Sequence, residues 1–275
     1  MEFKSKLEEK IYYEQQATEE EFLEWYKNLD LPTYEKPSVT VDNVILAYDS
    51  ASDDVKMLLI KRKAHPYKDC WALPGGFVEP SESTDETVIR EVKEEVGLDI
   101  SEKNIEQLYT FSTPNRDPRT WVITVAYLTF LPKLPEVVAG DDAKDAQWFS
   151  VNTSETNFSL VGADGTMFEI QAYLDKINDQ YNTNIAFDHA SIIRTALLRI
   201  RGSLDWKPKV LNILGDTFTL PNARKVYAKF LPVSSYKEID NSNFKKTHGK
   251  LFEEVGQRAE KVGRPAKLFK LKDTF

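Results

Sequence analysis

The sequence predicts an α/β domain followed by a small, basic winged helix-turn-helix domain. Between Ser38 and Arg201, strand-like runs rich in Val, Ile and Leu surround one well-capped helical pattern. From residue 204 onward, helical patterns are followed by a short hairpin pattern instead. The length of 275 residues also exceeds that of a typical domain of about 100–150 residues, so we expect more than one domain.

Composition excludes several classes of protein. Hydrophobic residues make up 41% and charged residues 29% of the chain, which is typical of a soluble globular protein. No run of about 18 apolar residues predicts a transmembrane helix, and Met1–Gln16 lacks the apolar core of a secretory signal. The single cysteine, Cys70, excludes an internal disulfide and a cysteine-based zinc site. We therefore expect a cytoplasmic protein in a reducing compartment, without membrane partners.

Charge is distributed unevenly along the chain. Residues 1–189 contain 18 Lys and Arg against 36 Asp and Glu, whereas residues 190–275 contain 18 against 8. The two parts therefore carry net charges of −18 and +10, which sum to the −8 of the whole chain. This asymmetry favours one part that handles metal or small molecules and another that meets a polyanion. Chance segregation of solvated surface charge is the alternative.

The predicted elements follow in order along the chain. Residues 1–37 form an arm with an amphipathic helix over Lys4–Asn28, expected to cover the body or a dimer partner. Ser83 and Glu86 form a capping-box pattern that starts a helix, and Gly97 ends it. Strands are expected around that helix at Ser38–Tyr48, Val55–Ala64, Trp71–Val78, Gln107–Ser112, Trp121–Leu131 and Gln147–Val151.

The segment Asn157–Asp188 fits two structures. Ala163–Gly165 is typical of a hairpin turn, whereas the pattern of Phe168–Ile177 also fits a helix. A helix over Ser191–Arg201 follows, and Gly202 after it is expected to mark a domain boundary. We therefore expect an arm at residues 1–37, an α/β domain at 38–203 and a winged-helix domain at 204–275.

A glutamate-rich stretch carries the clearest chemical signal. Glu91, Glu94 and Glu95 stand at positions i, i+3 and i+4, so a helix projects all three to one side. Like charges at this spacing repel one another, and a bound cation removes the conflict. All-oxygen ligands favour a hard ion, Mg²⁺ or Mn²⁺. Gly75 and Gly76 allow the backbone to approach closely, so a carbonyl there can serve as a further ligand.

The full pattern is specific. It reads Gly76-x5-Glu82-x7-Arg90-Glu91-Val92-x-Glu94-Glu95-x-Gly97-Leu98, and an ion pair between Arg90 and Glu82 could hold the carboxylates in place. A solvated, glutamate-rich helix face does not account for it. Seven fixed residues and two apolar positions are expected by chance on the order of 10⁻⁹ per start position.

This pattern resembles the Nudix box at every defined position. The resemblance implies a Nudix fold, which is an α/β/α sandwich around a mixed sheet. It also implies hydrolysis of a nucleoside diphosphate linked to another moiety, with Glu91, Glu94 and Glu95 as catalytic metal ligands and the carbonyl of Gly75 as a further one. The remaining defined positions form the structural part of the box: Gly76, Glu82, Arg90 and Gly97.

Hydrolysis also requires a general base. Metal ions on the glutamate face neutralise a diphosphate and lower the pKa of the attacking water, whose proton must then be removed. Asp141 and Asp142 are candidates for the base, in the later loop Val138–Ala143. Ordinary turn-forming residues are the alternative for both, and Asp142 is retained as the catalytic candidate.

The segment Pro114–Arg119 connects two predicted strands beside the expected site. Arg116 and Arg119 can fork onto phosphates, and Asp117 can accept a hydrogen bond from a ribose hydroxyl. Ordinary turn chemistry explains an Asp-Pro pair equally well. The stretch resembles a loop of Nudix proteins that act on ADP-ribose, and this favours the substrate-binding role.

The basic tail predicts a winged helix-turn-helix. Helices are expected over Thr217–Leu231 and Asn241–Val255, followed by a hairpin of Gln257–Lys261 and Lys267–Leu271. The second helix is expected to read base edges in the major groove, while Arg264 at the hairpin tip enters the minor groove. A basic appendage for oligomerisation is the alternative. The outward face of the second helix offers Asn241, Asn243, Lys245, Lys246 and His248.

Three further stretches resemble the Nudix-related transcriptional regulators of NAD metabolism. They are Phe187–Ala190, Thr217–Leu220 and Gly263–Lys270. In those regulators the Nudix domain senses effectors like ADP-ribose, and many have a degenerate box. The box of this chain is intact, which favours catalysis over a purely sensory role.

Two functions therefore compete at this stage. The first is a Mg²⁺-dependent Nudix hydrolase, best assigned as an ADP-ribose pyrophosphatase, with a DNA-binding tail. The second is a transcriptional regulator of NAD or sugar metabolism whose Nudix domain binds its effector without turnover. Palindromic DNA readers usually dimerise, so we expect a homodimer that binds duplex DNA.

Overall fold

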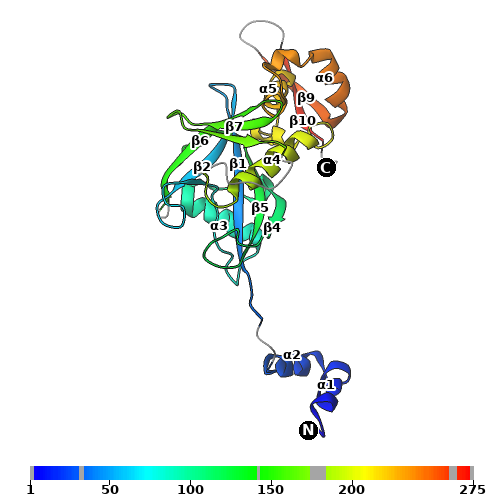
Figure 1. Cartoon of the computed structure of the whole chain (residues 1–275). Coiled ribbons are helices and arrows are strands. Elements are labelled where there is room, and N and C mark those ends of the chain that lie inside the picture. Colours follow the sequence, from blue (N-terminus) through cyan, green and yellow to red (C-terminus); the bar gives the residue numbers. More distant parts are fainter. Residues whose placement is uncertain (1–2, 31–33, 141–142, 174–183, 260–264, 273–275) are drawn as a thin grey trace. The chain divides into compact units, whose positions relative to one another are not determined.

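The computed structural model describes residues 3–30, 34–140, 143–173, 184–259 and 265–272 (Figure 1). The chain divides into two compact units, Met1–Lys36 and Pro37–Phe275, and each is described by itself. Within the described ranges, no helix is both long enough and apolar enough to cross a bilayer.

The first unit contains two helices, α1 (Lys6–Gln15) and α2 (Glu19–Lys27). The prediction of one continuous helix was wrong, because Thr18 starts a new one. The Thr18 hydroxyl accepts a hydrogen bond from the Glu21 N–H at 3.3 Å, and the Glu21 carboxylate accepts one from the Thr18 N–H at 2.9 Å. None of the described residues in this unit is buried.

The second unit is built on a mixed sheet. Its strand order is β4-β5-β1-β2-β6-β7-β8, with the short β3 paired to β2. Among the strands in the described ranges, β1 and β5 pair in parallel and the other pairs are antiparallel. The strands are β1 (Ser38–Asp49), β2 (Asp54–Arg62), β3 (Trp71–Ala72), β4 (Ile105–Phe111), β5 (Val122–Leu131), β6 (Ala143–Thr153), β7 (Asn157–Val161) and β8 (Met167–Gln171).

A helix covers each face of this sheet. Alternate residues of β1 point to opposite faces, so Val44 and Leu46 pack in one apolar cluster while Ile45 packs in another. The cluster of Ile45 contains the buried side of α3 (Thr84–Val96), and the cluster of Leu46 contains that of α4 (His189–Ser203). The α/β/α sandwich with a mixed sheet is therefore confirmed.

Local signals in the sequence explain several boundaries. Ser83 and Glu86 make the expected capping box at the start of α3, and Gly97 ends this helix with a φ of 71°, in the left-handed region that suits glycine. Strands β7 and β8 pair as a hairpin, so the helical alternative for Phe168–Ile177 was wrong in its described part. Gly202 lies inside α4, which ends one residue later.

The winged-helix domain is confirmed, with both of its helices shorter than expected. It contains α5 (Leu220–Phe230), α6 (Asn241–His248), β9 (Phe252–Arg258) and β10 (Ala266–Leu271). The helix expected over Thr217–Leu231 starts at Leu220 because Thr219 is its N-cap. The expected helix over Asn241–Val255 ends at His248 because Gly249 disfavours helix by about 1 kcal/mol. A single 3₁₀ turn follows, and Phe252 then pairs with Leu271 across the wing hairpin.

The two domains of this unit share one apolar core. The cluster on the α4 face continues into the winged-helix domain through Val226 and Phe230 of α5 and Phe244 of α6, all fully or almost fully buried. Burying each such side chain contributes about 1.5–3 kcal/mol. At the C-terminal end of α4, Arg201 donates a hydrogen bond to the Phe230 carbonyl at 2.8 Å. Figure 1 shows α4 beside α5 at this junction.

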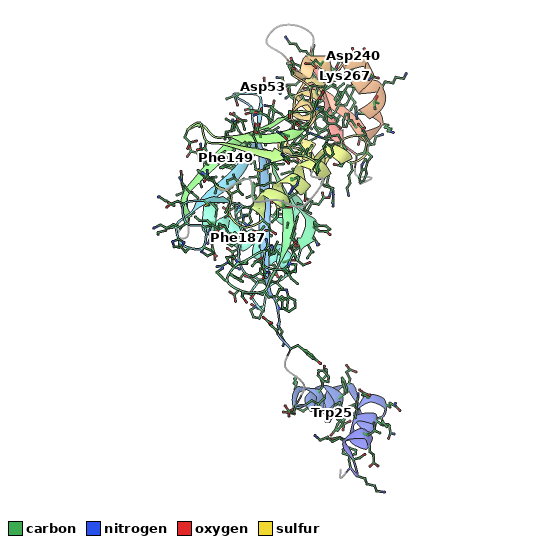
Figure 2. The ribbon with its side chains drawn as sticks, viewed as in Figure 1. Trp25, Asp53, Phe149, Phe187, Asp240 and Lys267 are labelled. Carbon is green, nitrogen blue, oxygen red and sulfur yellow. The ribbon has the colours of Figure 1, made fainter. Side chains whose placement is uncertain are left out.

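Charged side chains add to the same junction. Asp53 and Asp54, at the β1–β2 turn, form ion pairs with Lys225 and Lys229 of α5, and Lys225 lies 2.6 Å from Asp53. Figure 2 shows Asp53 at this end of the unit and Phe187 well away from it. The domain junction near Asp53 and the residue Phe187 therefore lie at different ends of the sheet.

Candidate active site

A cavity of about 430 Å³ lies where β1, the Gly75–Gly76 bend, α3 and the start of α4 meet. It brings together two of the three predicted metal-binding glutamates and the predicted substrate loop. The residues that line it include Asp42, Arg62, Gly75, Gly76, Phe77, Glu91, Glu95, Arg116, Asp117, Arg119, Phe187 and His189.

The two glycines are required by close packing. A Cβ on Gly76 would lie 2.1 Å from a carboxylate oxygen of Glu91, and one on Gly75 would lie 2.0 Å from the Val41 carbonyl oxygen. The Gly75 N–H donates a hydrogen bond to the Glu95 carboxylate at 2.8 Å. The bend therefore holds α3 against the sheet with both carboxylates on the cavity wall.

Both of these carboxylates are hard to ionise as they stand. Burial, followed by the neighbouring charges of Glu91 and Asp42, raises the pKa of Glu95 to about 8, although its hydrogen bond from Gly75 acts in the opposite direction. Burial also raises the pKa of Glu91, against the effect of Arg90. A divalent cation would compensate this clustered negative charge.

Arg90 organises the outer side of the carboxylate group. Its guanidinium donates to Glu82 at 2.8 and 3.0 Å, to Glu91 at 2.8 Å and to Glu94 at 3.0 Å. The ion pair expected between Arg90 and Glu82 is thus present. Glu94 has 59% of its side chain exposed and turns to Arg90 rather than into the cavity.

The donor set fits a hard divalent cation. Within the described part of the chain, no three His, Cys, Asp or Glu side chains are arranged as a complete metal site. Glu91 and Glu95 nevertheless offer only oxygen donors on the cavity wall, where burial disfavours their charged forms and a cation would favour them. The roles of Glu91, Glu94, Glu95 and the Gly75 carbonyl as metal ligands remain predictions.

The substrate loop is held by internal ion pairs. Arg116 is 4% exposed and donates to Asp188 at 2.6 and 2.9 Å and to Asp42 at 3.2 Å. Arg119 donates to Asp117 at 2.7 Å, and Asp117 also accepts the Arg119 backbone N–H at 2.9 Å. All three predicted residues line the cavity, but a phosphate would compete with two carboxylates for Arg116. Their substrate contacts remain predictions.

Sequence reasoning missed a buried network behind the cavity. Burial opposes the charge of Asp42, but His189 and then Arg116 outweigh it and hold the pKa of Asp42 at about 2. His189 lies 3.2 Å from Asp42, and its Nδ1 accepts the Leu73 N–H at 2.9 Å. The sequence signal for this network is Asp42 itself, a charged residue inside the apolar run Ser38–Tyr48.

Sequence reasoning also missed an aromatic end of the cavity. Phe77 and Phe187 line it together with Arg62 and Arg119, and the guanidinium groups of these two arginines lie over the aromatic rings. The structure places Arg62, the last residue of β2, on the cavity wall. No spacing pattern links Phe77 to Phe187, because they meet only in the folded chain.

The predicted DNA-binding residues form an exposed face of α6. Asn241, Asn243, Lys245 and Lys246 are all exposed. The outward position expected for His248 was wrong, because its ring is buried against Phe244 and lies 2.8 Å from Asp205. Three other candidates, Asp141, Asp142 and Arg264, lie outside the described residues.

Family models match both domains of the second unit. The model described as NUDIX domain matches residues 38–165. The model described as NrtR DNA-binding winged helix domain matches residues 210–271. Together they cover the glutamate motif, the predicted substrate loop and the exposed face of α6, whereas Phe187 and His189 of the cavity wall lie between the two matched ranges.

Individual relatives extend this picture. The chain is 45% identical over 129 residues to an ADP-ribose pyrophosphatase of Methanocaldococcus jannaschii, covering 46% of this chain and 71% of that protein. It is 24% identical over 256 residues to an ADPR responsive transcriptional repressor of Acinetobacter baylyi, covering 92% and 88%. A crystal structure of a MutT/nudix family protein from Enterococcus faecalis is 47% identical, with a TM-score of 0.87 over 98% of this chain and 100% of that one.

Proposed function

Because the chain belongs to the Nudix family and carries an NrtR-type winged-helix domain, we propose that it is a Mg²⁺-dependent hydrolase of ADP-ribose. In this reaction water adds across the P–O–P bond and gives AMP and ribose 5-phosphate. The observation that carries the proposal is the pair Glu91 and Glu95, held by the glycine bend on the wall of a cavity large enough for a nucleotide.

Nudix hydrolases generally use divalent metal ions, and Mg²⁺ is our proposal for this chain. Glu91, Glu95 and the Gly75 carbonyl would hold the cation, with Glu94 joining by leaving Arg90. When bound, Mg²⁺ supplies charge neutralisation for the diphosphate and lowers the pKa of the attacking water. Asp142 is retained as the proposed general base.

The chain's own residues prepare the substrate for attack. Arg90 fixes the carboxylate of Glu91, so that this group needs little reorganisation before binding. The network of Asp42, His189 and Arg116 holds the cavity floor rigid. Arg116 and Arg119 supply positive charge beside the carboxylate end, which favours a diphosphate there.

Purified full-length protein tests this function directly. With ADP-ribose and Mg²⁺ we expect equimolar AMP and ribose 5-phosphate, and no turnover once the metal is chelated. NAD, NADH and nucleoside triphosphates serve as competing substrates in the same assay. Faster turnover of any of these, or product formation with the metal chelated, would contradict the assignment.

A second function is favoured by the winged-helix domain. We propose that the chain also binds duplex DNA through α6 and regulates transcription in response to ADP-ribose, as a cytoplasmic homodimer. The supporting observation is the exposed α6 face of Asn241, Asn243, Lys245 and Lys246 on a family-matched DNA-binding domain. The test is DNA binding with and without ADP-ribose while hydrolysis is blocked by chelation. DNA binding that ADP-ribose leaves unchanged would exclude the response to ADP-ribose, and the absence of DNA binding would restrict the protein to catalysis.

A further inference from the structure

We propose that Asp188 is a positioning residue that competes with the diphosphate of the substrate for Arg116, and that this competition links the cavity to helix α4. The inference rests on the proposed function, because it names the group through which a ligand in this cavity would act on the winged-helix domain. It gives Asp188 a role that requires no contact with the substrate itself.

Asp188 stands at the start of α4 but does not cap it. It occupies the N-cap position, where an Asp side chain usually accepts a hydrogen bond from a backbone N–H of the first turn. Here the Asp188 side chain makes no such capping bond. Both of its carboxylate oxygens instead accept hydrogen bonds from the Arg116 guanidinium, at 2.6 and 2.9 Å. The side chain therefore has two alternative partners, which are Arg116 and the first turn of α4.

Arg116 lies between the cavity and α4. It lines the cavity, whereas Asp188 does not. Its side chain is 4% exposed and is held by two carboxylates, because Asp42 also accepts a hydrogen bond from the guanidinium at 3.2 Å. A guanidinium presents its N–H donors in one plane. A phosphate oxygen that binds Arg116 must therefore take donors from one of these carboxylates.

Of the two carboxylates, Asp188 is the one more easily displaced. Asp42 lies within β1, has a side chain that is 9% exposed and also lies 3.2 Å from His189. The Asp188 side chain is 18% exposed, and the backbone N–H groups at the start of α4 offer it another bond. A phosphate on Arg116 would therefore release Asp188 and leave Asp42 in place.

Helix α4 connects this point to the winged-helix domain. Its 15 residues span about 22 Å. At its far end, Arg201 donates a hydrogen bond to the Phe230 carbonyl at 2.8 Å, and the Leu204 carbonyl accepts one from the Tyr227 hydroxyl at 2.6 Å. Tyr227 and Phe230 belong to α5, and the Tyr227 ring packs edge-on against Phe244 of α6 at 4.9 Å. A shift of α4 on release of Asp188 would thus act on the helix that we propose to meet DNA.

The affinity for ADP-ribose tests the competition. Calorimetric titration of the full-length protein with the metal chelated prevents turnover and leaves the contacts of Arg116 in place. For Asp188→Asn we expect the dissociation constant to fall about 3- to 10-fold, because a neutral amide holds Arg116 less strongly than a carboxylate does. A residue that only supports the cavity would not tighten binding when it is changed. Unchanged or weaker binding would overturn the competition.

Two further variants separate this effect from one of stability alone. Asp54→Asn changes another nearly buried, ion-paired carboxylate that does not line the cavity, and its affinity for ADP-ribose should equal that of the wild type. Asp188→Ser keeps a side chain that is favoured at the start of a helix and replaces Asp188→Asn if that variant does not fold. It should bind ADP-ribose as tightly as Asp188→Asn. Tighter binding by Asp54→Asn, or wild-type affinity in Asp188→Ser, would overturn the role of Asp188.

The response of DNA binding tests the link to α4. The affinity of each full-length protein for duplex DNA is measured with and without ADP-ribose, again with the metal chelated. In Asp188→Asn the change caused by ADP-ribose should shrink to within about 2-fold, because the group that the ligand would displace is already loosely held. A response as large as that of the wild type would overturn the link.

Failure of the inference is distinguishable from failure of the proposed function. If the wild-type protein does not bind ADP-ribose, the proposed function fails, and inorganic pyrophosphate replaces ADP-ribose in the calorimetry. Tighter binding of pyrophosphate by Asp188→Asn than by the wild type would then support the competition, and equal or absent binding in both proteins would overturn it. Conversely, hydrolysis of ADP-ribose by the wild type with equal affinities in the two proteins retains the function and overturns the inference alone.

Discussion

The cavity and the outer face of α6 concentrate charge in opposite ways. In the cavity, Glu91 and Glu95 are held beside each other by a glycine bend, and burial raises the pKa of both. On α6, Lys245 and Lys246 are exposed to solvent, so their charges repel each other little. The charged forms of the two cavity carboxylates are therefore disfavoured as they stand, and a cation would relieve this, whereas the lysines of the α6 face only attract anions.

This difference predicts different sensitivity to substitution. A preorganised cavity should lose most of its function when one carboxylate is changed, because its groups act together on one reacting centre. An exposed basic face should lose function in proportion to the charges removed, because each phosphate contact contributes separately. The following variants test the contrast, beginning with the largest effect.

The strongest test compares two neighbouring glutamates. We expect Glu95→Gln to lower kcat/KM for ADP-ribose by at least about 100-fold, because it removes a proposed metal ligand from the cavity wall. Glu94→Gln should have a smaller effect, since Glu94 is largely exposed and turned to Arg90. Glu102→Gln, an exposed residue of the same domain, serves as the control.

The kinetics of the Glu95 and Glu94 variants show whether the cavity carboxylates act in turnover. Wild-type turnover by Glu95→Gln would show that the carboxylate pair is structural. Equal losses in the Glu95 and Glu94 variants would show instead that Glu94 leaves Arg90 during turnover. Steady-state kinetics at saturating Mg²⁺ distinguishes these results.

The second test addresses the α6 face. For the double variant Lys245→Glu and Lys246→Glu we expect the slope of log affinity against log salt to fall by about two, because two phosphate contacts are lost. The double variant Lys103→Glu and Lys133→Glu gives the same change in net charge on exposed positions of the Nudix domain. A salt titration of DNA binding by full-length protein measures both.

Equal loss in the two double variants would mean that net charge alone attracts DNA. No change in either would leave the winged-helix domain as an oligomerisation module. Asn243→Ala is expected to reduce preference for a specific site rather than general affinity, if this side chain meets a base edge.

Sequence reasoning succeeded where a signal is local. The capping box of Ser83 and Glu86, the stop at Gly97 and the pair of Glu82 and Arg90 all lie within a few helical turns, so spacing alone predicts them. The single helix predicted for the first unit was wrong because Thr18 and Glu21 form the same kind of capping box and start a second helix there. This boundary is also a local signal in the sequence.

Long-range contacts could not be predicted in the same way. Arg116 was expected to be available to a phosphate, yet it pairs with Asp42 and Asp188, which are 74 and 72 residues away. The Phe77–Arg119–Phe187 stack likewise forms only when three separate segments meet. The buried position of His248 depends on the core around Phe244, which its charged neighbours do not reveal.

A smaller effect separates two roles of Arg119. As a phosphate ligand, Arg119→Ala should raise the KM for ADP-ribose about 10-fold with kcat largely retained, because a charge-assisted contact is lost. Arg119→Lys should raise the KM less, because the charge remains. As a structural partner of Asp117 alone, Arg119→Ala should leave the KM unchanged, and that result would remove the residue from the substrate site.

The smallest effect is expected at the junction that joins the two regions. Asp54 is nearly buried and forms ion pairs with Lys56 at 2.9 Å and with Lys229 of α5. Burial opposes its charge, but the bonds from Lys229, Ser150 and Lys56 outweigh this and lower the pKa of Asp54. Asp54→Asn should therefore reduce the free energy of unfolding by about 1–3 kcal/mol. Asp53→Asn, at a site that is 52% exposed, should cost at most about 0.5 kcal/mol.

The dependence on pH provides an independent check of Asp54. Because its pKa is lower in the folded than in the unfolded chain, its contribution is complete above the unfolded pKa of about 4 and is lost as pH falls below that value. The stability difference between wild type and Asp54→Asn should thus be constant from pH 6 to 8 and shrink below about pH 4. Chemical denaturation at a series of pH values measures it. A stability difference between wild type and Asp54→Asn that persists undiminished in acid would mean that Asp54 acts through packing rather than through its charge. The ion pairs of Asp54 would then add nothing to the apolar core that the Nudix and winged-helix domains share.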